Sequence, residues 1–186
     1  MKTIDLIEAL ARGAGPAPRR AAARRLLPAG LVGTAISLSI VTAWIGQSPL
    51  DHQPAASLAM KFAYAGAFAI AAAWLAARLS RPAARAAPAG VLLAVVFAGM
   101  AAFGLLSIRE LPAADRIGHL LGYSWTVCPW AVLGLSLPGL AATLWAMRGL
   151  APTRPRTGGW AAGLLAGACG ALGYAVGCTE QAPSFV

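Results

Sequence analysis

Five long stretches of this chain are almost free of charged residues, and this limits the folds that the chain can adopt. Together they contain a single charged side chain, that of Lys61. A helix needs about 20 apolar residues to cross roughly 30 Å of membrane hydrocarbon. With 59% hydrophobic and 11% charged residues, the chain has too little polar surface for a soluble domain. The stretches predict five transmembrane helices, at residues 26–46, 58–77, 89–108, 126–147 and 160–177.

The predicted fold is therefore all-α, a polytopic transmembrane helix bundle. Residues 1–25 are expected to form a separate N-terminal segment, and residues 26–186 the bundle. A net charge of +9 would also suit a protein that binds nucleic acid. Most basic residues flank the apolar stretches, however, where membrane proteins carry them as determinants of topology. We therefore expect the lipid bilayer as a partner, and no direct contact with nucleic acid.

The basic residues alternate between connections, and this alternation predicts the orientation of the bundle. Twelve of the 15 lie in the N-terminal segment and in the second-to-third and fourth-to-fifth connections. Only Lys61, Arg109 and Arg116 fall on the other side. Basic loops of membrane proteins stay in the cytoplasm. The pattern predicts a multi-pass protein of a bacterial inner membrane with a cytoplasmic N-terminus.

Two cysteines are expected to meet at the outer face of the membrane. Cys128 begins the predicted fourth span and Cys178 follows the fifth, in an antiparallel hairpin whose arms are each roughly 27–30 Å long. Neighbouring helix axes lie about 8–10 Å apart, so the two sulfurs can come within bonding reach. In an oxidising periplasm such a pair can form a disulfide. Cys169 lies in the middle of a span and is interpreted as inert packing.

A metal site is a second interpretation of the same face. Two thiols and a histidine suit a soft metal such as zinc or cadmium, with Cys128, Cys178 and His119 as candidate ligands. The alternative is that His119 is an ordinary loop residue in contact with solvent. No resident cofactor is expected, although a heavy metal could bind transiently.

The N-terminal segment contains a short amphipathic helix that Thr3 can cap and that Gly13 ends. Its apolar face contains Leu6, Ile7 and Leu10, with Asp5 beside them. A helix this short is marginal in water, so it must lie on the membrane or dock into a partner. Its acidic residues favour a protein partner in the cytoplasm. A frayed N-terminal end is the alternative.

Three functions fit a small membrane bundle with this N-terminal helix and these thiols. A protein that sequesters a cytoplasmic partner, such as an anti-sigma factor, needs a docking helix and an outward-facing sensor, and the chain offers both. A membrane thiol-disulfide oxidoreductase commonly uses two disulfide pairs, whereas this chain has one separated pair. A transporter usually has ionisable residues near the middle of the membrane, and none is predicted there. These arguments favour binding and sensing, and we expect no enzyme activity.

Six short motifs also carry a family resemblance: MKTIDLI at 1–7, KFAY at 61–64, CPW at 128–130, LSLP at 135–138, LWAMRGLAPT at 144–153 and CTE at 178–180. In their order and spacing they resemble the NrsF family, bacterial inner-membrane negative regulators of sigma F and related extracytoplasmic-function sigma factors. The resemblance implies that the N-terminal segment holds the sigma factor. It also implies that Cys128 and Cys178 sense heavy metal or oxidative stress. The family is expected to have six spans, so we expect a sixth to be missing at the C-terminus.

Overall fold

The computed structural model describes residues 3–13, 21–45, 54–81, 84–109, 111–150, 152 and 154–179. These residues form seven helices and no strand. The helices are α1 (Thr3–Gly13), α2 (Ala21–Ile45), α4 (Ala55–Leu79), α5 (Ala87–Ser107), α6 (Ala113–Leu121), α7 (Cys128–Arg148) and α8 (Pro155–Gly177). Residues 180–186, which precede the expected sixth span, lie outside this description.

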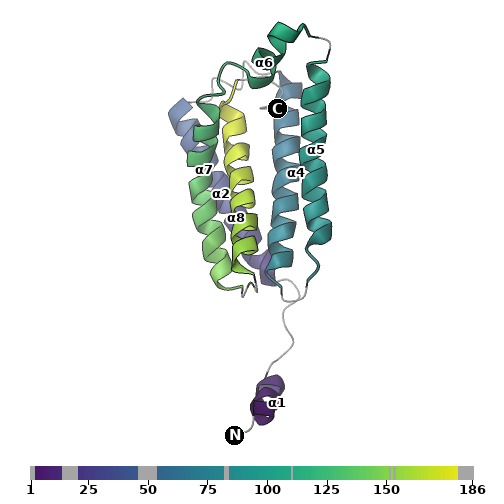
Figure 1. The fold of residues 1–186 in the computed structure, drawn as a ribbon. Coiled ribbons are helices and arrows are strands. Elements are labelled where there is room, and N and C mark those ends of the chain that lie inside the picture. The colour runs from purple at the N-terminus through teal and green to yellow at the C-terminus, as the bar shows by residue number, and fades with distance from the viewer. Residues whose placement is uncertain are drawn as a thin grey trace.

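Five of these helices are long and apolar enough to cross a membrane, which confirms the predicted fold class. They run side by side and alternate in direction (Figure 1). Their ends differ from the predicted spans by at most five residues, at the starts of α2 and α8. At the start of α2 the extra residues are three alanines and two arginines, which are good helix formers, whereas α8 begins with Pro155, a residue suited to the first turn of a helix. Arg24 and Arg25 therefore belong to the first long helix and not to the N-terminal segment.

The last helix, α8, forms the centre of the bundle. In its most apolar stretch 56% of the residues are buried, whereas the share in the other four long helices is 11% to 22%. It packs against α2, α4 and α7, while α5 packs on the outer side of α4 (Figure 1). The central helix therefore contacts three of the other four long helices.

Small residues allow these helices to approach closely. A Cβ atom added at Gly173 would lie 2.7 Å from the Cβ of Ser37, on α2. One added at Gly170 would lie 2.8 Å from the backbone nitrogen of Ser136, on α7. Packing at backbone contact is a common way for helices to associate within a membrane, where the hydrophobic effect between them is absent. These two glycines fix α8 against its neighbours.

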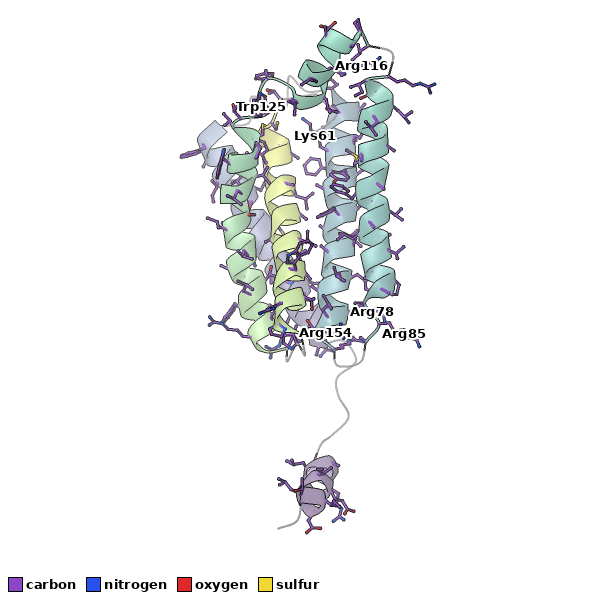
Figure 2. All side chains as sticks on the ribbon, viewed as in Figure 1. Lys61, Arg78, Arg85, Arg116, Trp125 and Arg154 are labelled. Atoms are coloured by element: carbon purple, nitrogen blue, oxygen red, sulfur yellow. The ribbon has the colours of Figure 1, made fainter. Side chains whose placement is uncertain are left out.

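The basic residues lie at the two ends of the bundle in unequal numbers. Figure 2 shows Arg78, Arg85 and Arg154 at one end and Lys61 and Arg116 toward the other. We call them the arginine-rich end and the arginine-poor end. The unequal distribution expected from the sequence is thus present in the structure. Which end faces the cytoplasm stays a prediction.

Two short helices lie outside the five-helix bundle. At the arginine-poor end, α6 was not expected from the sequence; it has no buried residue and ends at Gly122, whose φ of 66° is a conformation that favours glycine. At the N-terminus, α1 also buries none of its residues, and it ends at Gly13 as predicted. The two-part domain division stays a prediction.

Candidate thiol site

Cys128 and Cys178 line one small cavity near the arginine-poor end of the bundle, with a volume of about 290 Å³. They are contributed by the start of α7 and the end of α8, and both side chains are buried. This is the arrangement expected from an antiparallel hairpin with one cysteine at each open end. The cavity brings the two predicted thiols together.

The backbone holds Cys128 in place at the first residue of α7. Its N–H donates to the Ser124 carbonyl oxygen at 2.9 Å. Pro129 follows, in the first turn of a helix, where a missing N–H costs nothing. With an exposed fraction of 1%, the Cys128 thiol is closed off from solvent.

The hydroxyl of Tyr174 lies between the two cysteines. Its oxygen is 3.1 Å from the Cys128 sulfur, within hydrogen-bonding distance. It also interacts with the thiol of Cys178, which follows four residues later and so lies on the same face of α8. The two thiols therefore share the Tyr174 hydroxyl as a partner.

Lys61 closes the cavity from α4. Its side chain is only 4% exposed. Its Nζ donates a hydrogen bond to the Cys178 carbonyl oxygen at 2.8 Å. The last carbonyls of a helix lack partners within that helix, and a cation there also interacts favourably with the helix dipole. Lys61 thus caps the end of α8 from a neighbouring helix.

The chain after α8 has a further tether at this end. The hydroxyls of Thr179 and Tyr123 lie 3.1 Å apart. Tyr123 belongs to the connection between α6 and α7. The segment that carries Cys178 is therefore held at two residues, by Lys61 at Cys178 and by Tyr123 at Thr179.

This arrangement can support two kinds of thiol chemistry. The cysteines are free thiols in the structure. Two thiols that share a cavity can be oxidised to a disulfide, or can bind a soft metal ion as thiolates. Both reactions would change the contacts of the Tyr174 hydroxyl. The two thiols and the Tyr174 hydroxyl thus meet at the end of the central helix.

His119 lies outside this cluster. It belongs to α6 and is exposed. In the part of the chain that the structure describes, no three His, Cys, Asp or Glu side chains come together as metal ligands. Cys169 is also separate: it is buried in the middle of α8, and its thiol lies 3.5 Å from the Gly30 carbonyl oxygen.

The candidate partner-binding face on α1 is exposed. The exposed fractions are 44% for Leu6, 61% for Ile7 and 66% for Leu10. The helix begins at Thr3, and Asp5 lies in its first turn. Glu8 and Arg12 form an ion pair at 2.8 Å along the helix. An apolar stripe with nothing packed on it is the form expected of a helix that docks into a groove.

Lys61 and Tyr174 are the members of the thiol site that the sequence did not single out. Lys61 is the only charged residue in the predicted spans, and an ionisable residue within a membrane is by default a functional candidate. Tyr174 precedes Cys178 by one helical turn. Both signals were present, but neither specifies which cavity the side chain enters.

Known proteins match this chain over nearly its full length. The model of the NrsF family, "Negative regulator of sigma F", matches residues 10–186. The chain is 38% identical to the anti-sigma-F factor NrsF of Caulobacter vibrioides, over 100% of this chain and 88% of that protein. It is 36% identical to the probable anti-sigma-F factor NrsF of Azospira oryzae, with the same two coverages. No solved structure matches it.

Proposed function

The chain belongs to the NrsF family and is a negative regulator of a sigma factor, and we propose that α1 holds an extracytoplasmic-function sigma factor at the bacterial inner membrane. Reaction of Cys128 and Cys178 would then release it. The observation that carries this proposal is the contact of the half-buried Tyr174 with both thiols at the end of the central helix. A regulatory switch needs such a reactive group on an element that the rest of the bundle contacts.

The exposed stripe of α1 supports the docking role. Leu6, Ile7 and Leu10 recur at helical spacing and are uncovered. Eleven residues cannot bury such a stripe against themselves, so a partner's groove is the surface that would cover it. The positive-inside rule would place α1 in the cytoplasm with the sigma factor, and the thiols on the periplasmic side.

The proposed oxidation needs a two-electron oxidant such as hydrogen peroxide. One thiol attacks the peroxide, becomes a sulfenic acid and releases one molecule of water. The other thiol then displaces a second water from that sulfur, and the disulfide forms. The two cysteines lose two electrons and two protons, and the peroxide is reduced to water. A soft metal ion such as Cd²⁺ would instead displace both thiol protons and bind the two sulfurs.

Release requires that the two states of the bundle bind sigma with different affinity. Either reaction displaces the Tyr174 hydroxyl and strains the Lys61 cap at the Cys178 carbonyl. Because α8 contacts α2 at Gly173, a shift of α8 moves the helix that follows the N-terminal segment. The packing of α8 and α2 is thus the proposed two-state element.

Docking can be tested by recovering the sigma factor with the full chain from bacterial membranes. Leu10→Glu places a charge in the apolar stripe and should lower sigma recovery roughly tenfold or more, since a buried leucine contributes about 1.5–3 kcal/mol. Ala9→Glu adds the same charge about 100° around the helix from Leu10, outside the stripe, and is the matched control. Equal recovery with both variants would refute docking through this stripe.

Release can be tested with the same complex. Hydrogen peroxide and Cd²⁺ are added separately to membranes that hold the full chain and its sigma factor. We expect release from the wild-type chain with at least one of them and none from Cys128→Ser. If Cys128→Ser releases sigma as the wild type does, the thiols have no part in the response.

A further inference from the structure

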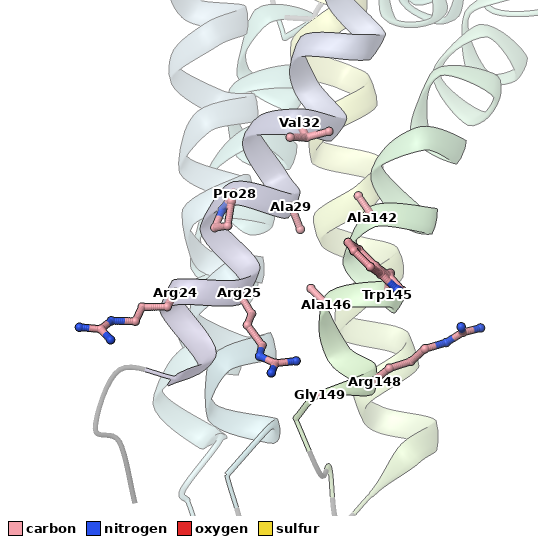
Figure 3. A pocket seen from close by; sticks show the side chains of 10 residues that line it. All are labelled: Arg24, Arg25, Pro28, Ala29, Val32, Ala142, Trp145, Ala146, Arg148 and Gly149. Carbon is pink, nitrogen blue, oxygen red and sulfur yellow. The ribbon is translucent and has the colours of Figure 1, made fainter.

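A groove at the arginine-rich end has a composition that suits a lipid. It lies between α2 and α7 and encloses about 560 Å³. Three arginines stand at its mouth, Arg24 and Arg25 from α2 and Arg148 from α7. Its deeper wall is apolar and includes Ala29, Val32, Ala142 and Trp145 (Figure 3). A basic mouth and an apolar wall form an amphiphilic surface.

The packing of the two helices explains why this space exists. α2 and α7 meet at Gly33 and Gly139, where an added Cβ would lie 2.5 Å from the facing Cα. The groove lies on the arginine-rich side of this contact. There the facing side chains Ala29, Ala142 and Ala146 are small and leave the space between the helices open (Figure 3).

The charge of the groove has no counterpart within the bundle. The helices α2, α4, α5, α7 and α8 contain no aspartate or glutamate. Figure 3 shows Arg25 reaching from α2 toward Gly149 of α7, with Arg24 and Arg148 extending outward on either side. Three guanidinium groups at a helix end favour a bound anion, and arginine suits phosphate because its planar fork can donate two hydrogen bonds.

The position of the apolar wall favours a phospholipid over an acidic protein segment. Val32 lies eight residues beyond Arg24, roughly 12 Å further along the helix axis. Val32 and Trp145 are 51% and 75% exposed, so the groove opens sideways, where the acyl chains of a membrane would be. A free phosphate or a polar peptide would leave this wall uncovered.

We propose that this groove is a binding site for an anionic phospholipid, with the phosphate held by Arg25 and Arg148 and an acyl chain along Ala29, Val32 and Ala142. Basic sites at the ends of transmembrane helices recognise anionic headgroups in this way. The lipid would fill the space between α2 and α7, and so support the helix that follows the N-terminal segment. The groove shares no lining residue with the thiol cavity and none with the apolar stripe of α1.

Gly149 provides a test that leaves the charge unchanged. A Cβ atom added there would overlap the guanidinium of Arg25. The backbone at Gly149 has a φ of −93°, which alanine adopts without strain. Gly149→Ala therefore displaces the Arg25 side chain from the groove, Arg25→Gln removes its charge, and Arg85→Gln removes a charge at the same end outside the groove.

The experiment uses the full chain reconstituted into vesicles of equal parts phosphatidylglycerol and phosphatidylcholine, then extracted in mild detergent. Native mass spectrometry measures the ratio of the two lipids that remain bound. The wild type should prefer phosphatidylglycerol. Gly149→Ala and Arg25→Gln should each lower the ratio about fivefold, the effect of one arginine near an anionic surface. Arg85→Gln should leave it unchanged.

Three outcomes would overturn the lipid site. The first is a wild-type chain without preference between the lipids. The second is an equal loss in Arg85→Gln, which would reduce the effect to diffuse surface charge. The third is an unchanged lipid ratio in Gly149→Ala or in Arg25→Gln; if sigma recovery also falls there, the groove is a protein-docking surface instead.

Discussion

Replacing Lys61 with methionine should open the thiol site locally, because the change removes the ammonium and keeps most of the apolar stem. The Lys61 side chain is buried, and it donates to the Cys178 carbonyl at 2.8 Å. A hydrogen bond from a charged group contributes about 1.5–3 kcal/mol. A reagent can reach the buried Cys178 thiol only when the end of α8 moves away. Loss of the bond should therefore raise the population of the open form roughly 10- to 150-fold.

The assay is the rate at which a maleimide labels Cys178 in membranes that hold the full chain with Cys128 and Cys169 replaced by serine. When closing is faster than labelling, this rate follows the open population. Arg116→Gln is the matched control, because it removes a cation at the same end that donates only to loop carbonyls. A Lys61→Met rate within about twofold of the parent would refute the capping role, since the predicted change is at least tenfold.

A second measurement separates local opening from a loosened bundle. In a chain that retains Cys169 as its single thiol, Lys61→Met should leave the labelling rate unchanged. Cys169 lies in the middle of α8, more than two turns from the capped end. Equal acceleration at Cys169 would mean that Lys61 supports the whole bundle.

Three further substitutions test the packing and the thiols. Tyr174→Phe keeps the ring and removes the hydroxyl, so peroxide should form the disulfide about 2- to 10-fold faster, the effect of losing one neutral hydrogen bond. The rate is followed on non-reducing gels, and an unchanged rate would show that the hydroxyl does not restrain the thiols. Gly173→Ala should destabilise the bundle by about 1–3 kcal/mol through overpacking against α2. Gly163→Ala should leave the stability unchanged, because a Cβ added there meets open space. Equal thermal midpoints of the Gly173→Ala and Gly163→Ala variants in detergent would contradict this account. Cys128→Ser should abolish a stress-induced transcriptional response that Cys169→Ser retains; a response lost in both would point to misfolding.

The spans could be predicted from the sequence because the membrane imposes a length and excludes charge. Each long helix contains one predicted span, and the errors lie at the ends, where hydropathy no longer decides. The nine-residue α6 was missed because a short exposed helix has no such constraint. Its Ile117 and Leu121 do recur at helical spacing, but both are exposed, so no packing distinguishes the helix from a loop.

The sequence predicts that the two cysteines meet, but it does not predict which side chains surround them. Cys128 and Cys178 end the two arms of one short-looped hairpin, so helix length alone places them together. Lys61 is 117 residues from the carbonyl that it caps. Its burial depends on α4 packing beside the end of α8, which no local pattern encodes. The ammonium is buried within the protein because the end of α8 offers it a hydrogen-bond partner.

The arrangement of the helices restricts how the thiols can act on α1. The thiol site lies at the arginine-poor end, whereas α2, the next described helix after α1, begins at the other end. An effect that joins them has to pass through helices that contact both, and α5 packs mainly on α4. The central helix α8 qualifies, since it carries Tyr174 at one end and contacts α2 at Gly173. The proposed lipid groove lies between α2 and α7, on the same α2. Thiol chemistry and membrane lipid would therefore act on one helix from opposite ends, and a bound anionic lipid that holds α2 would oppose its displacement by α8.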